Sequence, residues 1–146
     1  MNDLTDLYQD LIIEHYRRPR NHRLLEDANR SAEGFNPLCG DHVTLYLKVK
    51  DGVVEDVSFV GTGCAISTAS ASLLTESVKG RTEAEARALI ADFQRLVTSE
   101  DVQPELGKLQ ALAGVRRFPA RVKCATLAWH TLRAALTREP AAVSTE

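Results

Sequence analysis

The sequence predicts an α+β fold, in which helices pack on a small antiparallel sheet of three strands. Apolar and polar residues alternate between residues 42 and 60, as in paired strands, whereas apolar residues recur at helical spacing near both ends of the chain. Strands and helices do not follow one another in turn as they do in parallel sheets. The 146 residues, 44% hydrophobic and 26% charged, suit one globular domain. We place this domain at residues 1–138 and expect a disordered tail at 139–146.

The first predicted element is a helix that begins near Leu4. Its apolar stripe consists of Leu7, Tyr8, Leu11 and Ile12. Pro19 cannot continue a helix, and the arginines before it suit a helix C-terminus. The basic run here consists of Arg17, Arg18, Arg20 and Arg23. It could dock an acidic partner, although a solvated helix end is the commoner explanation for such a run.

Strands come next. A weaker strand is expected at residues 31–35, followed by a hairpin with strands at residues 42–50 and 53–60. Asp51-Gly52 supplies the two-residue turn that hairpins prefer.

Helices fill the rest of the chain. One is expected to start at about Cys64, and Thr82 with Glu85 forms a capping box that starts the next. After a loop at residues 99–104, the leucines at residues 106–112 predict a short helix closed by Gly114. Pro119 fits the first turn of a last helix.

Charge and hydropathy exclude several classes of protein. The formal net charge of -2 does not indicate a nucleic-acid binder, and no stretch approaches the roughly 18 apolar residues of a membrane span. Asp3, Asp6 and Asp10 give the N-terminus the wrong charge for a signal or transit peptide. We therefore expect a cytoplasmic protein that binds neither nucleic acid nor membrane.

The three cysteines occupy distinct local settings. Cys39 lies in a predicted turn before a strand, Cys64 at a helix start flanked by glycine, and Cys124 one turn into a helix. Helix starts favour the thiolate form of Cys64 and Cys124. An odd number of distant cysteines in a reducing compartment leaves free thiols or metal ligands as the options. Because free cysteines often serve as small buried apolar groups, the spacing alone does not decide between them.

Three segments around the cysteines resemble the cysteine motifs of the U-type iron-sulfur scaffold family. They are NPLCGD at residues 36–41, GTGCAIS at 61–67 and FPARVKCA at 118–125. Two features are similar to the SufU branch rather than the IscU branch. Lys123 stands where the IscU-type pattern has histidine, and an extra segment lies within residues 84–114. The resemblance implies an IscU/SufU-like fold up to about Arg138.

The resemblance also implies a metal site. Cys39, Cys64 and Cys124 would bind one ion, with Asp41 as the fourth ligand because a protonated lysine has no lone pair to offer. Zn²⁺ suits a closed tetrahedral site of sulfur and oxygen ligands, and a [2Fe-2S] cluster is the alternative. Arg121 is expected to offset the negative charge beside the ligands, unless it is a solvated surface residue.

The four histidines are rivals to Asp41 as the fourth ligand. They are His15, His22, His42 and His130. His42 is the nearest in sequence, but strand alternation puts it on the opposite side from Asp41. His130 lies about 240° round a helix from Cys124 and is disfavoured as its co-ligand.

By the same resemblance, the chain is expected to be a zinc-dependent sulfurtransferase that accepts persulfide sulfur from a SufS-type cysteine desulfurase for iron-sulfur cluster assembly. A SufBCD-type scaffold would follow downstream. Cys39 would accept the sulfur after a partner histidine replaces it on zinc, while Cys64, Cys124 and Asp41 anchor the ion. Two alternatives are a scaffold that assembles and transfers a [2Fe-2S] cluster, and a protein with structural zinc whose surface activates a partner.

Overall fold

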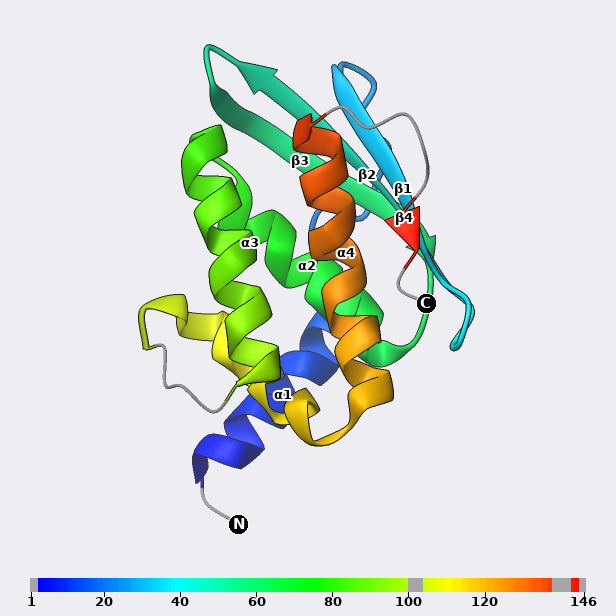
Figure 1. The fold of residues 1–146 in the computed structure, drawn as a ribbon, viewed down its shortest axis with the longest axis vertical. Coiled ribbons are helices and arrows are strands. Elements are labelled where there is room, and N and C mark those ends of the chain that lie inside the picture. The colour runs from blue at the N-terminus through cyan, green and yellow to red at the C-terminus, as the bar shows by residue number, and fades with distance from the viewer. Residues whose placement is uncertain (1–2, 100–103, 138–142, 145–146) are drawn as a thin grey trace.

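The computed structural model describes residues 3–99, 104–137 and 143–144 (Figure 1). Its α+β architecture, with a central antiparallel sheet of three strands, confirms the predicted class. The elements in chain order are α1 (Asp3–Arg17), β1 (Arg30–Asn36), β2 (Asp41–Lys50), β3 (Val53–Thr62), α2 (Ala65–Val78), α3 (Glu83–Thr98), the 3₁₀ segment η1 (Pro104–Arg117), α4 (Pro119–Thr137) and β4 (Val143–Ser144).

The strand order is β3-β2-β1-β4. The pairs β1–β2 and β2–β3 are antiparallel, whereas β4 lies parallel to β1 opposite Gly34 and Phe35. The prediction of a disordered tail is therefore wrong for Val143–Ser144. Without β4, β1 would be an edge strand with unpaired backbone groups, which readily accept a further strand. The rest of the predicted tail lies outside the described residues.

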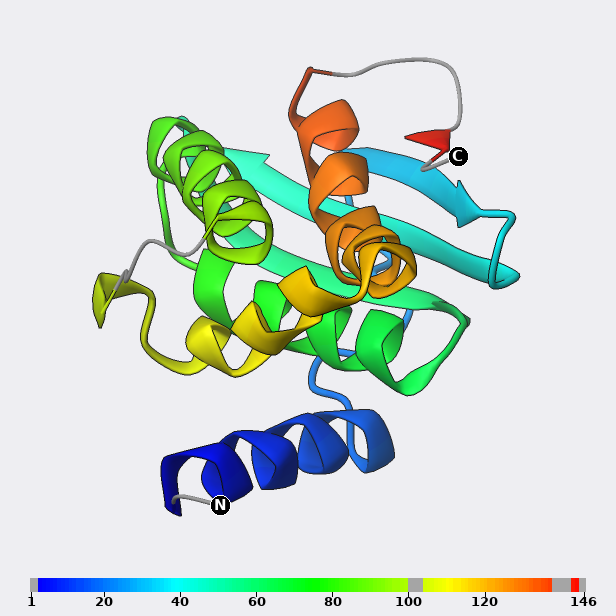
Figure 2. The same cartoon turned by 60° about the horizontal axis from the view of Figure 1, so that its bottom comes forward.

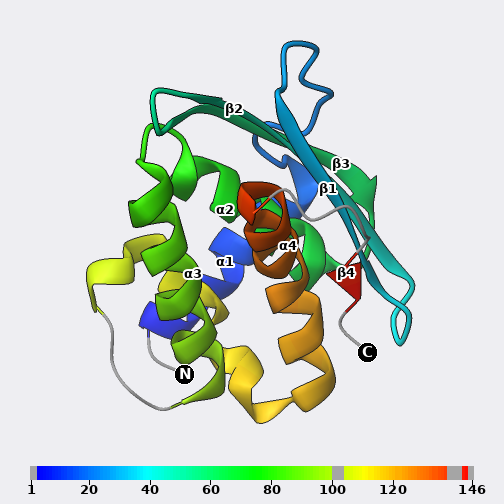
Figure 3. The same ribbon diagram turned by 45° about the horizontal axis from the view of Figure 1, so that its top comes forward.

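Helices cover one face of the sheet. Helices α2 and α4 lie over this face (Figures 1 and 3). The alternate residues Val43, Leu45 and Leu47 of β2 are buried on it, as the sequence alternation predicts. The N-terminal helix α1 lies beyond α2, on the side away from the sheet (Figure 2, blue). The order of layers is therefore sheet, then α2 and α4, then α1.

A buried histidine joins α1 to α2. Ser72 Oγ accepts the backbone N–H of Arg20 at 2.8 Å and lies 2.7 Å from Nδ1 of His15, whose side chain is 1% exposed. The Ser72 hydroxyl proton is then free to point at Nδ1, which accepts it only while the ring is neutral. Burial is the main cause that lowers the pKa of His15. The contact therefore favours an uncharged imidazole.

Helix α4 comes very close to β1 at Gly34. A Cβ atom at this position would overlap Oγ1 of Thr131 and touch the side chain of Leu127. Glycine within a strand commonly marks such an approach. The contact holds the start of α4 near the end of β1, where the site described below is built.

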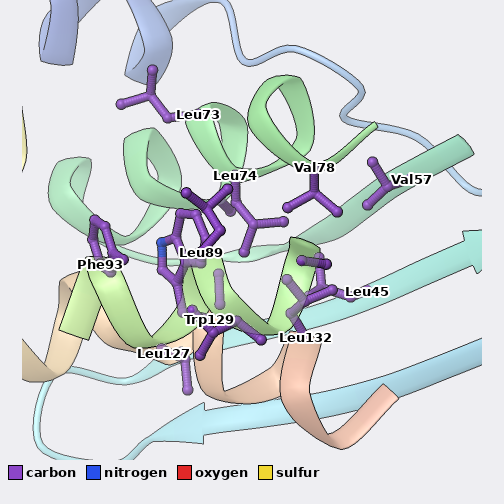
Figure 4. Packing of buried hydrophobic residues seen from close by; sticks show 14 of the residues in the cluster. Leu45, Val57, Leu73, Leu74, Val78, Leu89, Phe93, Leu127, Trp129 and Leu132 are labelled. Carbon is purple, nitrogen blue, oxygen red and sulfur yellow. The ribbon is translucent and has the colours of Figure 1, made fainter. Parts of the chain in front are cut away.

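The core between α2, α3 and α4 centres on Trp129 (Figure 4). Its ring stacks on Phe93 of α3 with centroids 4.5 Å apart. Its indole N–H donates to Ser70 Oγ of α2 at 3.1 Å, and that hydroxyl donates to the backbone oxygen of Ala125 at 2.6 Å. The buried Ser70 therefore fixes α2 against the turn of α4 that also carries Cys124.

Local signals in the sequence predict the hairpin and α3 well. Asp51 and Gly52 have φ angles of 54° and 78°, the left-handed pair that a two-residue hairpin turn requires. The predicted capping box of Thr82 and Glu85 is present at the start of α3.

The predicted helix at residues 106–112 differs from η1. The break lies at Gly107, where φ is 54°, and the 3₁₀ segment continues past Gly114 to Arg117. Gly114 is not among the residues with positive φ, so the backbone reversal expected of a closing glycine does not occur there. The loop expected at residues 99–104 falls mostly outside the described residues. None of the helices in the described ranges is long and apolar enough to cross a bilayer.

Candidate metal centre

The loop between β1 and β2 presents Cys39 and Asp41. Asn36 and Asp41 are the last pair in the register of the two strands, and the backbone N–H of Cys39 donates to the oxygen of Asn36 at 3.3 Å. Cys39 is exposed, whereas Asp41 is only 1% exposed. His42 points to the other face, where its ring stacks on that of Phe35 with centroids 4.7 Å apart. The predicted separation of His42 from Asp41 is confirmed.

Cys64 is the N-cap of α2, which begins where the sequence predicts. Its sulfur accepts the backbone N–H of Ser67 at 3.4 Å. Its own backbone N–H donates to Oδ1 of Asp41 at 2.9 Å. The start of α2 is thereby tied to the start of β2.

Cys124 projects from the early turns of α4 and is buried. Its sulfur lies 3.5 Å from that of Cys39 and accepts the amide of Asn36 at 3.4 Å. Burial, together with hydrogen bonds that involve Asp41, Cys39 and Cys64, raises the pKa of Cys124. Burial and these hydrogen bonds oppose the thiolate form that the helix start is expected to favour at Cys124.

Three of the four predicted ligands form a compact group. The sulfur atoms of Cys39 and Cys124 and a carboxylate oxygen of Asp41 all lie within 4.8 Å of one another. Cys64 is not in this group. Its sulfur accepts the backbone N–H of Ser67 at the start of α2, and its role as a ligand stays a prediction. Among the described residues, no histidine belongs to a potential metal-binding group of this kind.

The environment of Asp41 suits a cation. Both oxygens of the buried carboxylate accept hydrogen bonds, from the backbone of Cys64 at 2.9 Å and from Asn36 Nδ2 at 3.1 Å. None of the ion pairs within the described ranges includes Asp41. Because a buried carboxylate is costly without a positive partner, the donor set of two sulfurs and one oxygen fits a divalent ion such as Zn²⁺.

Arg121 lies beside the sulfur atoms, in the first turn of α4. A hydrogen bond with Cys124 is the main cause that raises the pKa of its guanidinium, followed by the charges of Cys64, Cys124 and Cys39. The side chain is exposed, so the guanidinium is free to face a docking partner as well as the cysteines.

Apolar surface surrounds the site. Leu38 and Phe118 are 65% and 61% exposed, next to Cys39 and at the start of α4 respectively. An open groove of about 750 Å³ runs between α1, η1 and α4, and Ile66, Phe118 and Arg121 line the part that belongs to the cysteine motifs. Large exposed apolar side chains beside reactive groups are typical of a surface that receives another protein.

Asn36, for which the sequence predicts no role, contacts two of the three grouped residues. It is fully buried, and its amide nitrogen donates to Asp41 and to Cys124. The alternation of β1 could have indicated a role for this residue. Ala32 and Gly34 precede Asn36 on the buried face of the strand, where a polar amide is not expected.

Comparisons with known proteins agree with this arrangement. The family model described as NifU-like N terminal domain matches residues 7–143. The chain belongs to the NifU-like N-terminal domain family. The resemblance to U-type iron-sulfur cluster assembly proteins is thereby confirmed.

Individual members of the NifU-like N-terminal domain family carry two kinds of name. The iron-sulfur cluster assembly scaffold protein IscU of Streptococcus pyogenes is 41% identical, with 94% of this chain and 87% of the relative covered. The zinc-dependent sulfurtransferase SufU of Bacillus subtilis is 39% identical, with 94% of each covered. A solved structure titled as a scaffold protein for the SUF system of Fervidobacterium islandicum has a TM-score of 0.83 at 34% identity, with 87% of this chain and 94% of the other covered.

Proposed function

We propose that this chain is a zinc-dependent sulfurtransferase that accepts persulfide sulfur from a SufS-type cysteine desulfurase during iron-sulfur cluster assembly. The observation that carries the proposal is the group formed by Cys39, Asp41 and Cys124, in which only Cys39 is exposed. One sulfur is accessible to a partner while two ligand side chains are buried behind it. The name of the Bacillus subtilis relative supports the same activity.

Cys39, Cys64, Cys124 and Asp41 would hold the zinc ion. Bound zinc would keep the Cys39 sulfur in the thiolate form that attacks persulfides, yet zinc ligands exchange readily. In the transfer, the Cys39 thiolate attacks the terminal sulfur of the partner's persulfide. A new sulfur–sulfur bond forms on Cys39, the sulfur–sulfur bond of the partner breaks, and the partner's cysteine leaves as a thiolate.

The residues around Cys39 have supporting roles in this proposal. Arg121 would stabilise negative charge on the sulfur atoms while Cys39 is away from the ion. Leu38, Phe118 and the groove lined by Ile66 would receive the desulfurase. A SufBCD-type scaffold would take the sulfur onward.

The deciding experiment combines metal analysis with sulfur transfer. The purified protein should contain about one zinc ion per chain, and it should gain one sulfur atom on Cys39 when mixed with a persulfide-loaded cysteine desulfurase. Mass spectrometry of the peptide that contains residue 39 measures this gain. Cys39→Ser should remain folded but neither gain sulfur nor stimulate the desulfurase. Unchanged stimulation by Cys39→Ser would refute the assignment.

A scaffold that carries a [2Fe-2S] cluster is the second candidate, because several relatives are named scaffold proteins. A brown protein that passes its cluster to an apo-acceptor would favour it, and a colourless zinc protein would speak against it. In a third possibility, zinc is structural and the surface activates the partner. A persulfide trapped on Cys39 would exclude that possibility.

A further inference from the structure

Asn36 is in an unusual environment for an amide. It ends β1 on the buried face of the sheet and is fully buried. Its Nδ2 group donates to Oδ2 of Asp41 at 3.1 Å and to the sulfur of Cys124 at 3.4 Å. Its Oδ1 atom is buried without a hydrogen-bond partner among the described residues. Both N–H bonds are therefore used toward the metal group, and the carbonyl oxygen has no partner.

The orientation of this amide follows from the chemistry of its neighbours. If the amide were turned over, Oδ1 would face an oxygen of the Asp41 carboxylate, which would repel it, and the N–H bonds would lose their present acceptors. The observed orientation leaves Oδ1 unsatisfied, which destabilises the folded protein. An apolar side chain would avoid that cost, as Ala32 does on the same face of β1. The amide must therefore contribute something that packing alone does not require.

We propose that Asn36 is a positioning residue for the metal centre, an inference that rests on the metal site of the proposed function. Its two N–H bonds hold the Asp41 carboxylate and the Cys124 sulfur at the separation of co-ligands. It also places a neutral donor against two groups that carry negative charge when they bind metal. A neutral donor relieves their repulsion yet does not compete with the cation, as a lysine at this position would.

The test compares three substitutions of Asn36 with one control. Asn36→Ala removes both donors, Asn36→Asp replaces them with acceptors and adds a charge, and Asn36→Ser keeps one donor. Asn29→Ala is the matched control, since Asn29 also makes two hydrogen bonds, both to the backbone of Val49 near the other end of the sheet. The variant Asn29→Ala also loses two hydrogen bonds within the fold, but neither of them is to Asp41 or Cys124.

The first measurement is zinc affinity, by competition with a chromophoric chelator. Asn36→Ala should bind zinc about 10- to 100-fold more weakly, the usual effect of losing a partner behind a metal ligand. Asn36→Asp should lose more zinc affinity than Asn36→Ala, and Asn36→Ser should lose less. Asn29→Ala should keep the wild-type affinity, although its thermal midpoint falls. Circular dichroism checks that each metal-free variant is folded.

The second measurement is the absorption spectrum of the Co²⁺-substituted protein, which reports on the geometry and the sulfur ligands. Asn36→Ala should change the ligand-field and thiolate charge-transfer bands, and Asn29→Ala should not. Wild-type zinc affinity and an unchanged cobalt spectrum in whichever Asn36 variants fold would overturn the inference and leave the proposed function standing. Wild-type protein that binds zinc but accepts no sulfur would overturn the proposed function and leave the role of Asn36 standing. Wild-type protein that binds neither metal would overturn both.

Discussion

The two connections at the ends of β2 differ in what holds them together. At one end, Asp51 and Gly52 close the hairpin with β3 through their left-handed backbone angles, and the backbone N–H of Glu83 at the start of α3 donates to the oxygen of Gly52 at 2.9 Å. At the other end, residues 37–40 join β1 to β2, and this loop depends on the start of α2 and on Cys124 of α4. The first connection carries none of the predicted metal ligands, whereas the second brings together the segments that carry all four. Metal chemistry should therefore respond to changes at only one end of β2.

The largest expected effect is that of Asp41→Ala, which removes the carboxylate from the second connection. Zinc should be held more than about 100-fold less tightly, because the loss of a ligand should exceed the 10- to 100-fold loss caused by an outer partner. Chelator challenge followed by metal analysis measures the effect. Asp27→Ala is the control, since Asp27 forms an exposed ion pair with Lys48. A full complement of tightly held zinc in Asp41→Ala would contradict its role as a ligand.

A pair of glycine substitutions compares the two ends directly. A Cβ atom at Gly63 would lie 2.9 Å from Oδ1 of Asp41 and 3.2 Å from Ser67 Cβ, so Gly63→Ala should displace the carboxylate and weaken zinc binding about 10-fold. Gly52 has positive φ and open space around it. Gly52→Ala should lower the free energy of unfolding by about 1 kcal/mol without changing zinc affinity.

Zinc competition and urea unfolding should be measured on both glycine variants. If Gly52→Ala weakened zinc binding as much as Gly63→Ala, the two ends of β2 would not be independent.

The smallest expected effect is the dependence of stability on pH. It arises from two histidines that lie outside the connections at the ends of β2. Burial lowers the pKa of His15 and of His130 below the ordinary value of 6.5. The unfolded chain then binds more protons, so the stability that these residues contribute is present above about pH 6.5 and is lost as the pH falls through their folded pKa values. Urea unfolding of the metal-free protein should show lower stability at about pH 5.5 than at about pH 7.5.

The variant His15→Gln should narrow this difference in stability between the two pH values, and the exposed His22 supplies the control His22→Gln. An equal pH dependence in wild type and His15→Gln would show that the contact between α1 and α2 does not titrate in this range.

The parts of the fold that the sequence predicts correctly are mostly those decided by residues close together in the chain. The alternation in β2, the Asp51-Gly52 turn and the capping box at Thr82 are each decided within a few residues. The pairing of Val143–Ser144 with β1 depends on a strand edge more than one hundred residues earlier in the chain. The break at Gly107, rather than at Gly114, depends on how η1 packs, which periodicity does not specify.

In the candidate site, too, the motifs identify some residues, while other contacts depend on the fold. The family motifs point to Cys39, Asp41 and Cys124, and the fold brings these residues together. Asn36 lies within the first motif, but its contact with Cys124 spans 88 residues and depends on where α4 crosses β1. The first motif therefore includes Asn36, but it does not show that Cys124 is its partner.

The sulfur atoms of Cys39 and Cys124 belong to residues 85 positions apart, so an ion bound to both would cross-link more than half of the chain. Such a cross-link stabilises a fold by restricting the unfolded chain, and loops of this length are restricted most. Asp41 closes almost the same loop as Cys39. In the proposed zinc form, Cys39 could leave the ion to collect sulfur while Asp41 and Cys124 kept the loop closed, so the nucleophile could move without loosening the fold.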